Sequence, residues 1–458
     1  MLRTWQSECL DAALNKFTSG QPHFLCLATP GAGKTVMAAE IASSLKKQGI
    51  IDLVLCFSPS LAVAESIKST FSWRLNCTFN GGVGSIGGSY TYQNMLYMND
   101  EFWDLLKRYR VLVVFDEIHH CSGNNVIEAN AWGVEILTKI QDYAAFTLAL
   151  TGTPWRSDAL PISLARYSKP EGEIQCDYVY GLSEAVKDRV CRSPKIVLVD
   201  NDNDNLSIIS SNEEAKCFNS IQELLMNESI PYSAIITNRE AMLYLLGLSC
   251  HKLAEIRHVN PRAGGLVVAS SVEHANDLLL LLQNEFNQSG VIVTYRHDDP
   301  LNEITRFRTS DTQWIVSVGM VSEGTDIPRL QVCCHLSHIK TELYFRQVLG
   351  RILRISDAEN QEAWLYTIAE SQLSCFAERI AEDLPDNNTV IRLDRSTEQA
   401  FDIDNICGSS AGKLNSTSAA DKLGVNIDWG LGINQSKFNT QDFVLTLGTF
   451  KQRLLSVF

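Results

Sequence analysis

Residues 24–35 read FLCLATPGAGKT, an apolar run followed by a glycine-rich turn and a lysine. The apolar run at 24–28 predicts a buried strand, and a helical pattern begins near Lys34. Glycines between a strand and a helix let main-chain N–H groups close around an anion at the helix N-terminus. The stretch therefore predicts an α/β fold with a phosphate-binding loop at the end of one strand.

Short apolar runs and helical patterns alternate along two long parts of the chain. This alternation is typical of parallel sheets covered by helices on both faces. We therefore expect an α/β protein with two tandem, doubly wound parallel-sheet lobes. The further strand candidates are residues 53–57, 111–115, 146–151, 265–270, 291–295, 314–318 and 332–336, and helices are expected from Leu61 and at 272–285 and 342–354.

The segments between and after the lobes have a different composition. Residues 200–205 alternate Asp and Asn, a turn-forming run that predicts a break in the sheet. Helical patterns follow at 213–226 and 240–258, the second after the N-cap candidate Asn238. Periodicity fades after residue 384, which predicts a loosely ordered end. The expected division is a first lobe at 1–190, a helical connector at 191–260, a second lobe at 261–384 and a C-terminal tail or accessory element at 385–458.

The composition of the 458-residue chain, with 45% hydrophobic and 20% charged residues, is typical of globular proteins. No apolar run reaches the roughly 20 residues that cross a bilayer, and the N-terminus lacks the apolar stretch of a secretion signal. We therefore expect a cytoplasmic protein with no membrane partner. The net charge of −14 excludes a globally basic surface but allows Lys and Arg to gather along one groove.

Thirteen cysteines are scattered along the chain without any Cys-x-x-Cys pair. The adjacent Cys333 and Cys334 are poorly placed to hold one tetrahedral ion. We therefore expect buried thiols in a reducing compartment.

The phosphate loop and a later acidic pair predict a site for a nucleoside triphosphate and Mg²⁺. Lys34 would reach the β- and γ-phosphates, and the Thr35 hydroxyl would bind Mg²⁺. Asp116 and Glu117 follow the strand at 111–115, where ligands bind in parallel sheets. Asp116 would hold Mg²⁺, and Glu117 would orient and deprotonate the attacking water. The first loop position is Ala28 instead of glycine, and the other expected nucleotide contacts are Thr29, Pro30, Gly31, Ala32 and Gly33.

The motif set resembles the superfamily 2 helicases and translocases of the DExH type. Residues 116–119 read DEIH, and residues 2–6, LRTWQ, resemble the adenine-reading motif with Gln6 as the matched residue. The resemblance implies two RecA-like lobes, ATP and Mg²⁺ as cofactors, and nucleic acid lying across both lobes. His119, Thr151 and Thr153 would couple the ATP site to the nucleic acid. The residues implied to contact nucleic acid are Ser58, Pro59, Thr91, Gln93 and, in the second lobe, Thr325.

Two motifs of the second lobe complete the resemblance. Residues 322–328 read SEGTDIP, whose Gly324 and Asp326 are matched to nucleotide contacts. Residues 347–354 read QVLGRILR, whose Gln347, Arg351 and Arg354 are matched to the catalytic site. Because the two arginines lie three apart, the sequence predicts that they share one helix face. As fingers reaching across the cleft they would stabilise charge on the transferred phosphoryl group.

Three conspicuous side chains receive no catalytic role. His120 reads as structural, because adjacent loop residues such as His119 and His120 rarely share one metal ion. Trp155 and Trp314 are candidates for stacking on bases, but Trp314 lies inside a strand pattern, which favours the core.

The motifs favour DNA over RNA as the partner. The TGTPWR and EGTDIP sequences look more like those of DNA-repair, phage and restriction translocases than like those of RNA-directed DEAD-box proteins. Three hypotheses stay open. The first is a DNA helicase or translocase in repair, recombination or anti-phage defence, the second an RNA helicase of the same superfamily, and the third an ATPase regulatory subunit that recruits a partner nuclease. The resemblance suggests 3′ to 5′ movement, which no residue shows by itself.

Overall fold

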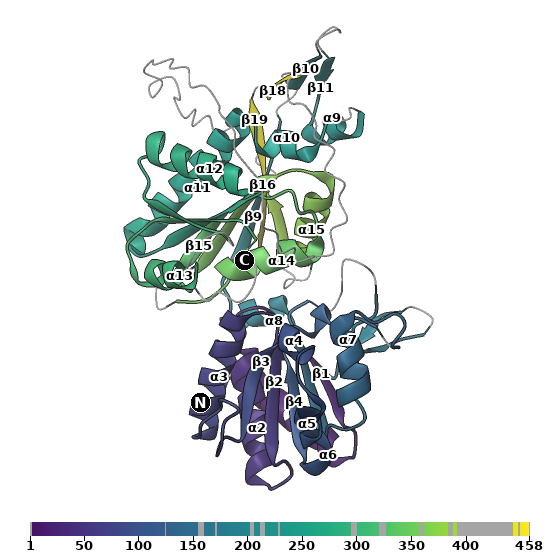
Figure 1. Ribbon diagram of the computed structural model, residues 1–458. Helices are drawn as coiled ribbons and strands as arrows, with labels where there is room; N and C mark the ends of the chain where they lie inside the picture. The colour runs from purple at the N-terminus through teal and green to yellow at the C-terminus, as the bar shows by residue number, and fades with distance from the viewer. Residues whose placement is uncertain are drawn as a thin grey trace, which may run out of the picture.

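The computed structural model consists of two lobes, drawn one below the other in Figure 1. Among the residues that it describes, no helix is both long and apolar enough to span a bilayer. The described residues are 2–123, 125–153, 160–169, 172–201, 206–210, 216–227, 230–294, 300–319, 327–356, 359, 361–382, 388–391, 443–447 and 449–457.

The first lobe is built on a six-stranded sheet in the order β3-β2-β4-β5-β1-β8, and every neighbouring pair is parallel. This confirms the parallel sheet and the four strands predicted there. All five residues of β4 are buried, and they alternate between the hydrophobic clusters on the two faces of the sheet. The strands are β1 (His23–Ala28), β2 (Leu53–Ser58), β3 (Gly87–Thr91), β4 (Val111–Phe115), β5 (Phe146–Thr151) and β8 (Tyr178–Tyr180).

Helices cover both faces of this sheet (Figure 1). On one face α2 (Lys34–Lys47) packs between α1 (Thr4–Thr18) and α3 (Leu61–Leu75). The other elements of the lobe are short, and two of them form a small hairpin. They are α4 (Tyr92–Met95), α5 (Asp100–Trp103), α6 (Leu105–Arg108), the 3₁₀ helix η1 (Ile118–His120), α7 (Ala131–Glu135), the π-helix η2 (Ile136–Ile140), β6 (Arg166–Tyr167), β7 (Ile174–Gln175) and α8 (Leu182–Lys187).

The second lobe contains an eight-stranded sheet in the order β13-β14-β12-β15-β16-β9-β19-β17. The pairs from β13 to β9 are parallel, and β19 and β17 are antiparallel to their neighbours. The four predicted strands are confirmed. The elements are β9 (Ser193–Asn201), α11 (Arg239–Val259), β12 (Gly264–Ala269), α12 (Val272–Asn284), β13 (Gly290–Val293), α13 (Pro300–Thr309), β14 (Trp314–Ser317), β15 (Leu330–Leu336), α14 (Glu342–Ile352), β16 (Glu362–Ile368), α15 (Ser371–Glu382), β17 (Asn388–Ile391) and β19 (Phe450–Val457).

The segment expected as a helical connector differs from the prediction. Its first part is strand β9, which pairs with β16 on one side and β19 on the other, so Asp200 and Asn201 lie in a sheet and not in a turn. The helix expected at 213–226 is wrong at its start, because Lys216–Phe218 forms β11. The helix expected at 240–258 is confirmed as α11, and the Asn238 side chain caps it. The other elements here are β10 (Leu206–Ser210), α9 (Ile221–Asn227) and α10 (Tyr232–Ile236).

The C-terminal segment also contributes to the sheets. Strands β19 and β17 extend the second sheet, and β18 (Phe443–Thr446) pairs with β10 in a small three-stranded sheet with β11. Two expectations lie outside the described residues: the rest of the polar run, 202–205, and most of the 385–458 segment.

Candidate active site

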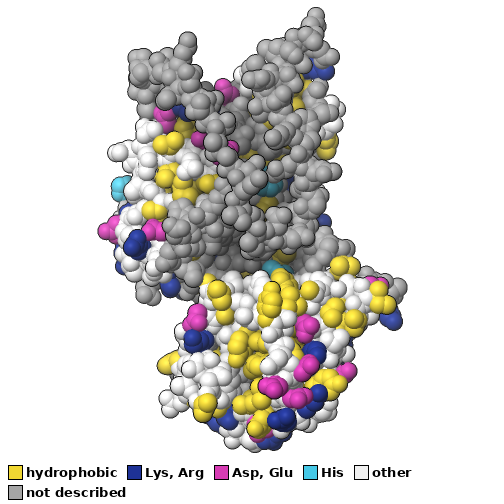
Figure 2. Space-filling view, viewed as in Figure 1, with side chains coloured by type: hydrophobic (Ala, Val, Ile, Leu, Met, Phe, Trp, Pro, Cys, Tyr) yellow, Lys and Arg dark blue, Asp and Glu magenta, His cyan; other side chains and the backbone are white. Residues whose placement is uncertain are grey.

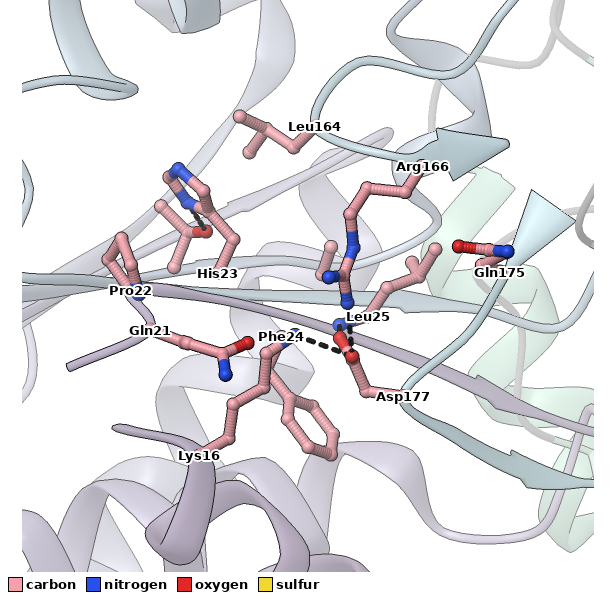
Figure 3. A pocket seen from close by; sticks show the side chains of 12 residues that line it. Lys16, Gln21, Pro22, His23, Phe24, Leu25, Leu164, Arg166, Gln175 and Asp177 are labelled. Atoms are coloured by element: carbon pink, nitrogen blue, oxygen red, sulfur yellow. Dashed lines mark hydrogen bonds and ion pairs between the residues drawn. The ribbon is translucent and has the colours of Figure 1, made fainter. Parts of the chain in front are cut away.

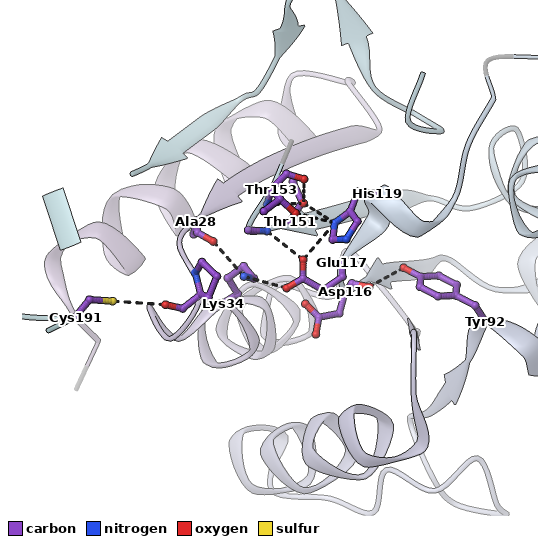
Figure 4. A network of polar contacts seen from close by, with 11 residues as sticks. Ala28, Lys34, Tyr92, Asp116, Glu117, His119, Thr151, Thr153 and Cys191 are labelled. Carbon is purple, nitrogen blue, oxygen red and sulfur yellow. Dashed lines mark hydrogen bonds and ion pairs between the residues drawn. The ribbon is translucent and has the colours of Figure 1, made fainter. Parts of the chain in front are cut away.

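The phosphate loop connects the end of β1 to the start of α2. Gly31 and Gly33 have φ angles of 83° and 98°, a left-handed conformation that glycine adopts without a steric penalty. The Lys34 Nζ atom donates to the Ala28 carbonyl at 3.1 Å and lies 3.3 Å from Glu117 Oε1 (Figure 4). The loop is therefore closed around a buried lysine that faces the acidic pair.

The predicted adenine-reading residue lies against this loop. Gln6 is buried, its Oε1 accepts from the Arg3 N–H at 2.9 Å, and its Nε2 donates to the Gly33 carbonyl at 3.0 Å. A Cβ atom on Gly33 would lie 2.8 Å from Gln6 Nε2, so only glycine allows this approach. Gln6 thus holds the phosphate loop, and its contact with adenine stays a prediction.

Asp116 and Glu117 follow β4, as the sequence predicted. The Tyr92 hydroxyl donates to the Asp116 carbonyl at 2.7 Å, which fixes the chain at this point. Glu117 has φ 52° and ψ 53°, a left-handed conformation that is uncommon outside glycine. Its Oε2 accepts from the Gly152 N–H at 3.1 Å, while Oε1 faces Lys34 (Figure 4). Glu117 thus has an unusual backbone conformation, and its carboxylate is held by Gly152 on one side and Lys34 on the other.

The two carboxyls differ in acidity. Burial raises the pKa of Asp116, and the negative charge of Glu117 raises it further. Burial also opposes ionisation of Glu117, but the charges of Lys34 and His119 outweigh it and hold the pKa of Glu117 well below its ordinary value. Glu117 is therefore the member of the pair that stays ionised more readily.

Asp116 also fits the predicted magnesium site. Its Oδ1 atom is buried without a hydrogen-bond partner among the described residues. In the same residues, no group of three or more His, Cys, Asp or Glu could hold a metal. Mg²⁺ often needs only one or two protein oxygens, with phosphates and water supplying the rest. Asp116 and the Thr35 hydroxyl would hold the ion in this way, and its charge would stabilise the ionised Asp116.

A buried network joins the acidic pair to the end of β5. His119 Nδ1 lies 3.0 Å from Thr151 Oγ1, 3.4 Å from Thr153 Oγ1 and 3.4 Å from Glu117 Oε2 (Figure 4). The Thr151 hydroxyl donates to the Thr153 carbonyl at 2.6 Å. The structure thus brings together the three residues predicted to couple the site to nucleic acid. The His120 ring lies beside the His119 ring, tilted by 33° with the ring centroids 4.6 Å apart.

The second lobe reaches the phosphate loop through Arg354. The prediction that Arg351 and Arg354 share one helix face is wrong, because α14 ends at Ile352 and Arg354 instead forms a β-bridge with Cys191. This places Arg354 directly across the loop, since a Cβ atom on Gly31 would lie 3.2 Å from Arg354 Cγ. Arg351 stays in the last turn of α14, one turn after Gln347.

The structure describes only some of the residues that were predicted to contact nucleic acid or the nucleotide. Ser58 and Thr91 are paired at the ends of neighbouring strands β2 and β3, and both are buried. Pro59 directly follows β2, and Gln93 is exposed on α4. Trp314 is fully buried, as predicted for a core residue. The residues Trp155, Gly324, Thr325 and Asp326 lie outside the described residues.

Two residues outside the sequence motifs lie at the junction of the lobes. The Cys191 thiol donates to the Pro30 carbonyl at 3.5 Å, and burial raises the pKa of this thiol to about 12. Arg192 is fully buried beside it. No spacing pattern marks either residue, because their partners come from both lobes.

A cavity of about 200 Å³ lies at the opposite end of β1, beside His23 and Leu25 (Figure 3). Asp177 on its wall accepts from Lys16, from Arg166 Nη2 at 2.7 Å and from the Leu25 N–H at 2.8 Å. These charges pair with one another, and the cavity is separate from the phosphate loop at the Ala28 end.

Known proteins resemble the chain in sequence and in fold. Residues 1–156 match the family described as the Res subunit of type III restriction enzymes. An uncharacterized protein of Mycobacterium leprae is 31% identical over 371 residues, which cover 77% of this chain and 59% of that protein. The DNA 3′-5′ translocase XPB2 of Sulfurisphaera tokodaii is 23% identical, over 78% of this chain and 80% of the translocase.

A solved fragment of a protein assigned as the HsdR subunit of a type I restriction enzyme, from Vibrio vulnificus, superposes with a TM-score of 0.56. It is 17% identical, and the match covers 82% of this chain and 65% of that chain, so it bears on the fold alone. The chain spans 59% of the length of its mycobacterial relatives. Together with the tandem RecA-like lobes, the sequence matches to the Res family and to XPB2 support the assignment of the chain to superfamily 2 of the helicases and translocases.

Proposed function

We propose that the chain is a DNA translocase or helicase that hydrolyses ATP between its two lobes. The observation that carries the proposal is the approach of Arg354, from the second lobe, to Gly31 in the phosphate loop of the first. A site built from both lobes changes when they move, so hydrolysis and movement are coupled.

Each side chain of the site has a defined task in hydrolysis. The phosphate loop and Lys34 bind the phosphates, and Glu117 orients a water molecule and takes its proton. Mg²⁺, held by Asp116 and Thr35, would neutralise charge on the β- and γ-phosphates. Arg354, with Arg351 and Gln347 from α14, stabilises the charge that develops on the transferred phosphoryl group.

Coupling to nucleic acid follows from the network at the end of β5. His119 contacts Thr151, Thr153 and Glu117, so a shift of residues 151–153 changes the position of the catalytic carboxylate. From the motif matches we propose that Ser58, Pro59, Thr91, Gln93 and Thr325 contact nucleic acid. Gly324 and Asp326 stay predicted nucleotide contacts by the same motif matches.

DNA is favoured because XPB2 is a DNA translocase by name and residues 1–156 match a restriction-enzyme subunit. On the face of the first lobe shown in Figure 2, acidic and basic side chains are interspersed with apolar ones. With a net charge of −14, contacts with the DNA backbone must come from a local groove.

A second candidate, an ATPase subunit that recruits a nuclease, is favoured by the same restriction-enzyme match.

Steady-state ATP turnover should be measured with single-stranded DNA, duplex DNA and RNA. Greater stimulation by DNA supports the proposal, and greater stimulation by RNA contradicts it. DNA unwinding or translocation by the chain alone separates the first candidate from the second, which would need a co-encoded nuclease for its activity.

A further inference from the structure

Arg192 lies where the chain passes from the first lobe to the second, between α8 and β9. It is one of the largest fully buried side chains of the protein. Its Nη1 donates to the carbonyls of Leu330 at 2.6 Å and Ile352 at 3.2 Å, and its Nη2 donates to the Pro328 carbonyl at 3.0 Å and the Ser356 hydroxyl at 2.9 Å. One guanidinium thus holds four acceptors.

The described partners of the Arg192 guanidinium are three main-chain carbonyls and a hydroxyl. No carboxylate pairs with Arg192 among the described residues, and burial lowers its pKa to about 10. A buried charge without a counter-ion is costly, and an apolar side chain fills a core at lower cost. The guanidinium has a property that apolar side chains lack, because its donors are fixed in one plane and set the spacing of several carbonyls.

The acceptors of Arg192 belong to segments that form the nucleotide site. Ile352 ends α14 two residues before Arg354, and the Arg192 N–H donates to the Leu353 carbonyl at 2.7 Å. Pro328 is the last residue of the SEGTDIP motif, and Leu330 starts β15.

Cys191, the residue before Arg192, contacts both lobes. Cys191 forms the β-bridge with Arg354, and its thiol donates to the Pro30 carbonyl of the phosphate loop. The two residues together therefore connect the arginine finger, the SEGTDIP motif and the phosphate loop.

We propose that Arg192 is a positioning residue that holds Arg354 against the phosphate loop and fixes the end of the SEGTDIP motif relative to it. The proposal rests on the proposed ATPase function. It extends that function to a residue that touches no substrate and acts through Arg354.

Arg329 offers a matched control in the same lobe. It is also buried, burial lowers its pKa to about 10, and it donates to main-chain carbonyls. Its acceptors are the carbonyls of Phe307 at 2.9 Å, Arg262 at 2.9 Å and Thr312, none of which belongs to the 351–354 segment.

The test compares Arg192→Met and Arg329→Met by melting temperature and by kcat and KM for ATP, at equal folded fraction. We expect both variants to melt at lower temperature. Only Arg192→Met should lose kcat, by about 10- to 100-fold, because a misplacement of about 1 Å costs up to of order 10² in rate. KM for ATP should stay within about twofold, since the phosphate loop is intact. An equal kcat in the two variants overturns the proposal.

Arg192→Lys serves if the methionine variant does not fold, because it keeps the charge but donates from a single atom. A double-mutant cycle with Arg354→Ala then isolates the mechanism. If Arg192 acts through Arg354, the lysine change adds no further loss of kcat in the Arg354→Ala background. A full additional loss overturns the proposal. If nucleic acid does not stimulate ATP turnover by the wild type, the proposed function is contradicted, but the proposal for Arg192 is not. The comparisons between the variants need only basal ATP turnover.

Discussion

Lys34 makes the most direct predicted contact with the nucleotide, and its ammonium also faces Glu117 at 3.3 Å. We expect Lys34→Ala to lower kcat for ATP by about 10²- to 10³-fold or more, because a charge that stabilises the transferred phosphoryl group is removed. Lys16→Ala is the matched control, since Lys16 is a comparably buried lysine of the same lobe that pairs with Asp177. Steady-state turnover and thermal melting check both variants. Wild-type turnover in Lys34→Ala would refute the assignment of the loop.

Glu117 is predicted to be the base that takes the proton of the attacking water. In Glu117→Gln the amide oxygen can still accept from the Gly152 N–H, but it cannot take up a proton at neutral pH. We expect ATP to bind while hydrolysis falls by about 10²-fold or more. Equilibrium binding of ATP and single-turnover hydrolysis measure the two steps separately. Rapid hydrolysis in this variant would show that another group acts as the base.

At the scale of elements, β5 contains two threonines that each contact a histidine. Thr151 Oγ1 lies 3.0 Å from His119 Nδ1 at the carboxyl end of the strand, and Thr147 Oγ1 lies 2.8 Å from His23 Nδ1 near its other end. Valine has the shape of threonine without the hydroxyl. We expect Thr151→Val to reduce the ratio of nucleic-acid-stimulated to basal ATP turnover, and Thr147→Val to leave that ratio unchanged. The same ratio in both variants would contradict the coupling role of the β5 end.

Strand β19 makes the C-terminus part of the second sheet. Leu455 is buried and paired with Ile196 of β9. We expect Leu455→Ala to lower the free energy of unfolding by about 2–5 kcal/mol, the usual cost of truncating a buried leucine. Urea unfolding measures this loss, with the exposed Lys451→Ala on the same strand as control. An unchanged free energy of unfolding would show that β19 does not stabilise the lobe.

The local sequence pattern predicted those elements whose signal lies within a few neighbouring residues. The buried run of β4, the capped helix α11 and the loop before α2 were all confirmed, because each is encoded within a few neighbouring residues. Strand β9 was missed, since Asp200 and Asn201 favour turns locally and are held in a strand by partners distant in sequence. Arg354 was placed on a helix for the same reason, because its bridge to Cys191 is a contact between distant segments.

For the molecule as a whole, we propose that one ATP site is shared between the lobes. The first lobe provides the phosphate loop, Lys34 and Glu117, and the second provides Arg354. If this is right, neither lobe completes the site by itself, and the movement of one relative to the other regulates hydrolysis.

The most direct test is single-turnover hydrolysis of saturating ATP by Arg354→Ala in the presence of DNA, compared with the wild type. Arg346→Ala is the control, since Arg346 lies in the middle of α14 in the same lobe and pairs with Glu342 at 3.0 Å. We expect Arg354→Ala to bind ATP normally and to hydrolyse it of order 10³-fold more slowly. Arg346→Ala should hydrolyse ATP at close to the wild-type rate. A wild-type rate in Arg354→Ala would contradict a site shared between the lobes.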